Sequence, residues 1–168
     1  MRPEHPGALT PALLAAYRAA HYVVPLGGRI CRFQVDVDPP PVLAAWLAEH
    51  GPAGWLSAFN PGSRRLPLLE NLARHDALWR RLRAEGYTAL AGYAEDPAGE
   101  WPDETSLLVP AIELHPLHRV ALDFGQLAFL RLAPEGPARL WLTDPSGVQP
   151  APGRTRGDRG ANGGTGGS

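Results

Sequence analysis

The sequence contains no lysine and only one cysteine, Cys31. A single cysteine excludes a disulfide within the chain, and we interpret Cys31 as a small buried residue of a strand. All 16 basic residues are therefore arginine, which is typical of the coding bias of a GC-rich bacterial genome. The chain also lacks the run of about 18 apolar residues that a membrane-spanning helix requires, and its start lacks the features of a secretion signal. We therefore expect a cytoplasmic protein with no membrane association.

A concentration of positive charge is also absent. The formal net charge is −1, and no block of basic residues forms the kind of patch that attracts a polyanion. Arg80, Arg81 and Arg83 lie close together in the sequence, but their spacing is typical of a solvated helix face. We therefore do not expect a nucleic-acid partner.

Apolar residues are sufficient for one core, since 44% of the 168 residues are hydrophobic. A chain of this length buries roughly two thirds of its unfolded surface, and we expect one globular domain over residues 1–144. From residue 145 to 168 glycine and arginine are frequent, and Val148 is the one sizeable aliphatic residue. Such a segment buries too little apolar surface to offset its ordering entropy. The sequence therefore predicts a disordered Gly/Arg-rich tail.

Helical and strand periodicities alternate along the predicted domain. Helices are expected where apolar residues recur every three or four positions after a start signal, over residues 10–20, 42–49, 67–86 and 115–123. Strands are expected at alternating or continuous short apolar runs, over residues 29–37, 55–59, 88–93, 105–112, 126–132 and 138–142. This order favours an α/β or α+β fold, with a single mixed β-sheet of about five to six strands and three to four packed helices.

A set of short landmarks occurs in a distinctive order, namely Tyr17 and Tyr22, Ala58-Phe59-Asn60-Pro61, Glu70-Asn71, Gly92, Trp101-Pro102-Asp103-Glu104-Thr105-Ser106 and Phe124-Gly125-Gln126. In this order and spacing the chain resembles the bacterial family catalogued as domain of unknown function 3293, over about residues 15 to 143. Phe59 and Thr105 depart from the family pattern. The resemblance implies a small, soluble, single-domain protein and implies no activity.

The first candidate site is the turn that follows the strand over residues 55–59. Asn60 stands at the end of this strand, and Arg64 follows within a few residues. The next helix directs its amino-terminal amides and positive dipole end toward the same region, so the turn is a candidate cradle for a small anionic ligand. The alternative is that Asn60 caps its own turn and that Arg64 is solvated, because Asn-Pro commonly begins a turn.

Glu70 and Asn71 are adjacent on the predicted helix over residues 67–86 and therefore project about 100° apart. Glu70 shares a face with Arg74, which favours a surface ion pair. Asn71 borders the apolar face, where an amide must find hydrogen-bond partners. We expect Asn71 to tie the helix to the Asn60 turn or to contact a ligand.

Glu104 and Ser106 are two residues apart at the start of a predicted strand, so their side chains emerge on the same face. A carboxyl group near the core can have a raised pKa, which makes Glu104 the candidate catalytic acid or base. Ser106 lacks a nucleophile elbow, which argues against a serine hydrolase. Gln126, at a helix-to-strand turn, is a candidate for the same crevice, and the alternative is an amide that satisfies backbone groups of its loop.

No cofactor or metal site is expected. No nucleotide-binding glycine pattern is present, and the spacing of His115 and His118 near Glu113 is weakened by Pro116 at the helix start. Two classes of function remain. One is a polar small-ligand pocket, with or without catalysis, and the other is a non-catalytic interaction or regulatory domain whose polar landmarks hold loops together.

Overall fold

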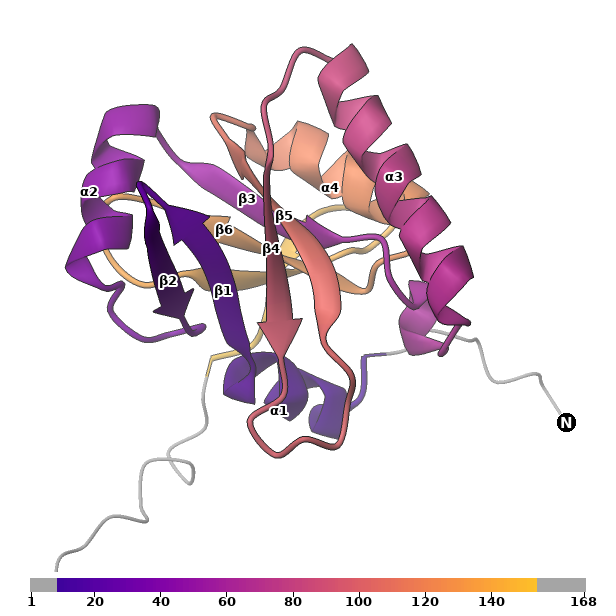
Figure 1. Cartoon of the computed structure of the whole chain (residues 1–168). Helices are drawn as coiled ribbons and strands as arrows, with labels where there is room; N and C mark the ends of the chain where they lie inside the picture. Colours follow the sequence, from indigo (N-terminus) through magenta and orange to yellow (C-terminus); the bar gives the residue numbers. More distant parts are fainter. Residues whose placement is uncertain (1–8, 154–168) are drawn as a thin grey trace, which may run out of the picture.

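The computed structural model describes residues 9–153, within which one eight-stranded sheet is accompanied by four α-helices (Figure 1). The elements in chain order are α1 (Pro11–Ala19), β1 (His21–Leu26), β2 (Arg29–Phe33), α2 (Pro41–His50), β3 (Ala53–Ser57), a short 3-10 turn (Pro61–Ser63), α3 (Leu68–Ala84), β4 (Leu90–Glu95), β5 (Glu104–Pro110), α4 (Leu114–Asp123), β6 (Ala128–Leu132), β7 (Arg139–Leu142) and β8 (Gln149–Pro150). No helix in this part of the chain has both the length and the apolar character needed to cross a membrane.

The strands lie in the order β2-β1-β4-β5-β3-β6-β7-β8, and all seven neighbouring pairs are antiparallel. The sheet coils strongly, as the crossing of β1 and β4 over β6 in Figure 1 shows. Its two sides approach each other where Val35, just after β2, forms a parallel bridge with Ala138, just before β7. The Asp36 N–H also donates to the Ala138 carbonyl at 3.0 Å. The coiled sheet therefore encloses one apolar layer on its inner face.

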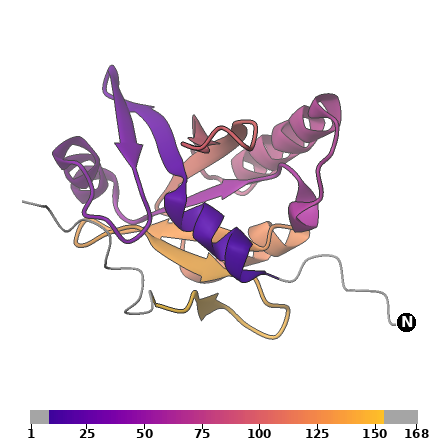
Figure 2. The same cartoon turned by 90° about the horizontal axis from the view of Figure 1, so that it is seen from below.

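Two apolar clusters correspond to the two faces of the sheet, and different helices pack on each. The inner cluster includes Tyr22, Phe33 and Trp55 and contacts side chains of α1 and α2. The outer cluster includes Leu107 and residues of α3 and α4. Figure 1 shows α1 under the lower ends of β1 and β4, and in Figure 2 it lies in front of the strands, away from α3. Helices on both faces bury the two sides of the sheet, as expected for this layer arrangement.

The four helices and the mixed α/β character predicted from the sequence are confirmed, but the predicted sheet is wrong in two respects. It has eight strands rather than five to six, and its ladders are antiparallel rather than mixed. β1 was not predicted because Pro25 interrupts its apolar run, although four of its six residues are buried. β8 lies in the predicted tail. The choice of partners is non-local, because β3 pairs with β5 and β6, which follow much later in the chain.

Ordered structure also continues beyond the predicted domain end at residue 144. Gln149 pairs with Leu142 of β7 in the short strand β8. The Ala151 N–H then donates to the Leu140 carbonyl at 2.9 Å. Part of the predicted disordered tail therefore adds an edge to the sheet, and residues 154–168 of that tail lie outside the described residues.

Candidate functional site

A cavity of about 690 Å³ lies between α1 and the inner face of the sheet. The alanine-rich side of α1 forms one wall, and Trp55, Leu130 and Leu140 form an apolar wall on the sheet. Residues of the β4–β5 loop, including Trp101, complete the lining. The volume lies within the roughly 300–1,000 Å³ typical of small-molecule sites, and the mainly apolar lining is also typical of them.

Polar side chains gather at one end of this cavity because of strand alternation and register. Glu104 and Ser106 occupy alternate positions of β5 and both line the cavity, as their spacing predicts. Ser57 of β3 pairs directly with Ser106 and lines the same space. Gln126 stands two residues before β6, and Asn60 follows β3. Four of the sequence-predicted site residues therefore meet at one place, namely Asn60, Glu104, Ser106 and Gln126.

Asn71 does not line the cavity but holds Asn60 in position. The Asn60 N–H donates to Asn71 Oδ1 at 2.9 Å, and Asn71 Nδ2 donates to Asn60 Oδ1 at 2.8 Å. Asn60 Oδ1 also accepts the Leu66 N–H at 3.0 Å. Asn60 has a left-handed backbone with φ of 48°, which asparagine tolerates better than most residues. The hydrogen bonds between Asn60 and Asn71 join the end of β3 to the start of α3. They also orient the side-chain NH2 group of Asn60 toward β5.

Glu104 receives that amide. Asn60 Nδ2 donates to Glu104 Oε1 at 2.9 Å, and within residues 9–153 no hydrogen bond reaches Glu104 Oε2. Burial raises the pKa of the Glu104 carboxyl above its ordinary value, and the hydrogen bond from Asn60 opposes this only in part. An acid with a raised pKa and one unpaired oxygen can exchange a proton or accept a hydrogen bond from a ligand. The assignment of Glu104 as a catalytic acid or base stays a prediction.

Two tyrosines from the amino-terminal part of the fold adjoin Glu104. Burial and the negative charge of Glu104 raise the pKa of Tyr17 to about 12, while a hydrogen bond from Ser63 lowers it. Burial also raises the pKa of Tyr22, whose hydroxyl donates to the Tyr17 carbonyl at 2.8 Å. Both residues line the cavity, and their phenols stay protonated near neutral pH. They supply neutral hydroxyl groups and aromatic surface to the site.

The serine hydroxyls of the site are engaged with the backbone. Ser106 Oγ donates to the Glu104 carbonyl at 3.1 Å, and its residue is 1% exposed. Ser57 Oγ donates to the Thr105 carbonyl at 2.8 Å and accepts the Phe59 N–H at 3.0 Å. No histidine is among the residues that line the cavity in the described part of the chain. The arrangement therefore provides no activated serine nucleophile.

Gln126 joins the start of β6 to the end of β3, because its Nε2 donates to the Phe59 carbonyl at 3.0 Å. The neighbouring Gly125 has a φ of +68°, and a Cβ there would lie 2.8 Å from Pro61 Cβ. The Gly62 N–H donates to the Gly125 carbonyl at 2.7 Å. Gly125 therefore lets two of the sequence landmarks pack directly against each other.

Close packing also explains why glycine occupies position 92, another of the sequence landmarks. Gly92 lies on β4 opposite Ser106, and a Cβ there would lie 2.6 Å from the Trp55 ring and 2.5 Å from the Val23 carbonyl. The absence of a side chain lets the Trp55 indole pack closely against β4 as part of the cavity wall.

Arg64, the cation of the predicted anion cradle, is not brought to the cavity. It is exposed, and the cavity is lined by its neighbour Arg65. The Arg65 guanidinium lies over the Trp101 ring, 5.4 Å from the ring centroid. Arg65 is exposed as well, and the left-handed backbone at Asn60 and Ser63 determines that it, rather than Arg64, borders the cavity.

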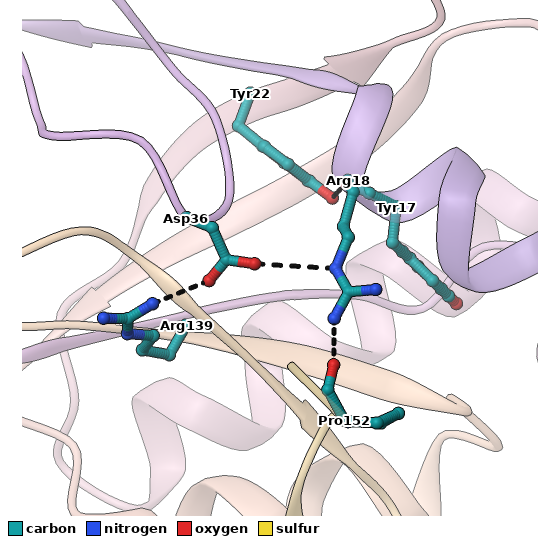
Figure 3. A network of polar contacts seen from close by, with 6 residues as sticks. All are labelled: Tyr17, Arg18, Tyr22, Asp36, Arg139 and Pro152. Atoms are coloured by element: carbon teal, nitrogen blue, oxygen red, sulfur yellow. Dashed lines mark hydrogen bonds and ion pairs between the residues drawn. The ribbon is translucent and has the colours of Figure 1, made fainter. Parts of the chain in front are cut away.

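The position of α1 over the cavity depends on Arg18, a residue that no sequence motif distinguishes (Figure 3). Arg18 Nε lies 3.5 Å from Asp36 Oδ2, and a second guanidinium nitrogen donates to the Pro152 carbonyl. Asp36 is also held by Arg139, with Nη1 at 2.8 Å from Oδ1. No residue of α1 is fully buried. The helix is therefore a cover held at its carboxyl end by contacts with segments distant in the sequence.

The described residues contain no group of three or more His, Cys, Asp or Glu side chains placed to hold a metal ion. His118 instead accepts the Asp144 N–H through Nε2 at 3.3 Å. His75, on α3, lies edge-on to Phe59 and Trp79, and its Nδ1 is buried without a hydrogen-bond partner. Burial lowers the His75 pKa.

Comparison with known proteins supports the family resemblance. The model of the family described as "Protein of unknown function (DUF3293)" matches residues 56–129. This segment contains Asn60, Asn71, Glu104, Ser106 and Gln126, whereas Tyr17 and Tyr22 precede it. No curated protein and no solved structure matches the chain.

Proposed function

We propose that the protein binds a small organic molecule in the cavity between α1 and the sheet. The family whose model matches residues 56–129 has a description that assigns no activity, so the proposal rests on the cavity. The ligand has an apolar body and one polar group directed at Glu104. The observation that carries this proposal is the convergence of a carboxyl group with a free oxygen on a cavity of about 690 Å³.

The polar residues of the site differ in whether their hydrogen-bonding groups are already used, and this difference supports the proposal. Asn60, Asn71 and Ser106 satisfy one another or the backbone, so they hold the site in shape. Glu104 retains one oxygen for a ligand, and the Tyr17 hydroxyl lies nearby. Such a site, with an apolar wall and a few convergent polar groups including one with a perturbed pKa, is typical of ligand-binding proteins and enzymes.

For any reaction in this cavity, Glu104 is the proposed general acid or base. A carboxyl group whose pKa is raised by burial transfers protons more readily near neutral pH than an exposed one. The adjacent serines are bonded to the backbone and provide no nucleophile, so proton transfer to or from the ligand is the chemistry favoured here.

The second candidate is the non-catalytic domain. It is favoured by the internal hydrogen bonding of Asn60 and Asn71, which explains those two landmarks without a ligand. A non-catalytic domain does not require the cavity. A substitution that fills the cavity should therefore abolish function in the first candidate and not in the second.

The test is a thermal-shift screen of the full chain with a library of small amines, alcohols, carboxylates and aromatic compounds. A ligand at about 100 times its Kd stabilises the fold by about 2.7 kcal/mol. Ala16→Trp places an indole in the cavity from α1, whereas Ala73→Trp places one on the exposed face of α3. We expect hits that Ala16→Trp abolishes and Ala73→Trp retains. A library without hits, or hits that survive Ala16→Trp, would contradict the proposal.

A further inference from the structure

The charged side chains that line the cavity are mostly acidic. Four carboxylates contribute to the lining, and the one arginine among the described lining residues is Arg65; the acids are Glu95, Asp96, Glu100 and Glu104. This is the opposite of the charge expected for an anion site, and the chain's overall charge of −1 does not explain such a local excess.

Two of these acids already have partners. Glu95 Oε1 lies 3.2 Å from Arg32 Nε and 3.8 Å from His21 Nδ1. The Asp96 carboxylate accepts three backbone N–H groups of its own loop, from Ala98, Glu100 and Trp101. Their charges are therefore balanced or locally stabilised by the fold.

Neither Glu100 nor Glu104 has a cation partner among the described residues, but Glu100 is exposed to solvent whereas Glu104 is half-buried. Its one hydrogen-bond donor is the neutral Asn60 amide, and the side chains adjoining it from α1 and β1 are the neutral phenols Tyr17 and Tyr22. Arg65, at the cavity mouth, lies over Trp101 and forms no ion pair with a described acid. A positively charged group in the cavity would supply the counter-ion that the fold itself does not.

Aromatic faces complete the environment of a cation. Tyr17, Tyr22, Trp55 and Trp101 all line the cavity. The Arg65 guanidinium over Trp101 shows that the mouth already accommodates a cation against an aromatic ring. Cations are attracted to such faces, most strongly where water is excluded. The described acids form no cluster suited to a metal ion, so an organic cation fits this environment better than an inorganic one.

We propose that the ligand is a protonated organic amine with an apolar body, whose ammonium group donates to Glu104 Oε2. This assignment rests on the proposed small-molecule function and specifies its chemical class. Glu104 is half-buried at the cavity wall, so an ammonium group that supplies the missing counter-ion gains a charge-assisted hydrogen bond.

The test compares three probes of similar size that differ in charge: phenethylamine, phenethyl alcohol and phenylacetate. Each is titrated into the full chain by calorimetry at mildly alkaline pH, which favours the ionised carboxylate over the neutral acid while the amine keeps its proton. We expect the amine to bind tightest and phenylacetate weakest. Glu104→Gln should weaken the amine about tenfold to a hundredfold, the value of a hydrogen bond to a charged group, and change the affinity of the alcohol by less than about threefold.

Glu49→Gln is the matched control, because Glu49 is an exposed acid on α2 outside the cavity lining. It should leave amine binding unchanged. If the alcohol or phenylacetate binds as tightly as the amine and Glu104→Gln has no effect on the amine, the cation assignment is wrong and the small-molecule site stands. If none of the three probes binds at millimolar concentration and the wider library also gives no hits, both the assignment and the proposed function are wrong.

Discussion

Replacement of Asn71 by alanine tests whether the link between α3 and the Asn60 turn stabilises the site. Asn71 is 4% exposed, and its amide makes three hydrogen bonds, two to Asn60 at 2.9 and 2.8 Å and one to the Leu66 carbonyl at 3.3 Å. Truncation leaves the Asn60 N–H without an acceptor, at a cost of about 1–3 kcal/mol for a buried unsatisfied group. Asn60 Oδ1 keeps the Leu66 N–H. Adding the loss of the two hydrogen bonds donated by Asn71 Nδ2 gives an expected destabilisation of about 3 kcal/mol.

The measurement is urea unfolding followed by tryptophan fluorescence. With an m value of about 2 kcal/mol/M, the midpoint should fall by about 1.5 M while m stays constant. Leu69→Ala is the control on the same helix, since Leu69 is 81% exposed and its truncation should change stability by less than about 0.5 kcal/mol. If Asn71→Ala costs no more than Leu69→Ala, the hydrogen bonds do not hold the turn and the reasoning fails.

Three further variants test the charges and the cover. Burial holds the Glu104 pKa above its ordinary value of 4.5, so ionisation of Glu104 destabilises the native state. The unfolding free energy of wild type should therefore fall relative to that of Glu104→Gln as pH rises from 4.5 through the raised pKa. If urea unfolding gives the same pH dependence for both proteins, this reasoning is wrong. Burial lowers the His75 pKa below 6.5, so the unfolding free energy of wild type should fall relative to that of His75→Phe as pH falls through 6.5. If both proteins lose the same unfolding free energy over this pH range, the reasoning is wrong. Arg18→Ala should accelerate amide exchange in α1 but not in β3, and unchanged α1 protection would show that Arg18 does not hold the cover.

The helices were predictable because their signals are local. Thr10 caps α1 through Oγ1, which accepts the Leu13 N–H at 3.1 Å, and prolines open both α1 and α2. The alternation over residues 29–37, which places the odd positions toward the core, is correct for Cys31, Phe33 and Val35, which are buried, but wrong for Val37, which is 44% exposed. Each of these features depends on residues within one or two turns of the chain.

The apolar face expected for α3 was only partly predictable. Leu78 and Leu82 are buried, but Leu68 and Leu72 are 64% and 42% exposed. The helix extends past the edge of the outer apolar cluster at its start, so the same periodicity faces the core in its second half and solvent in its first. Sequence periodicity gives the face of a helix but not how far the sheet beneath it extends.

The site was predictable where spacing determines direction and not where it depends on the coiled sheet. Alternation along a strand puts Glu104 and Ser106 on one face whichever strands lie beside them. The cavity itself arises because α1 lies across the inner face, held by Arg18 and Asp36. These two residues belong to different segments of the chain, and neither carries a recognisable motif. Contacts of this kind follow from the tertiary fold alone.

The most direct test of the small-molecule site is an amide-resolved NMR titration of the full chain with the tightest-binding compound from the thermal-shift screen. The account predicts saturable shifts concentrated at residues on opposite walls of the cavity, including Ala16 on α1, Ser106 on β5 and Gln126 before β6. Shifts confined to the exposed start of α3, or absence of shifts at these three residues under saturation, would contradict it.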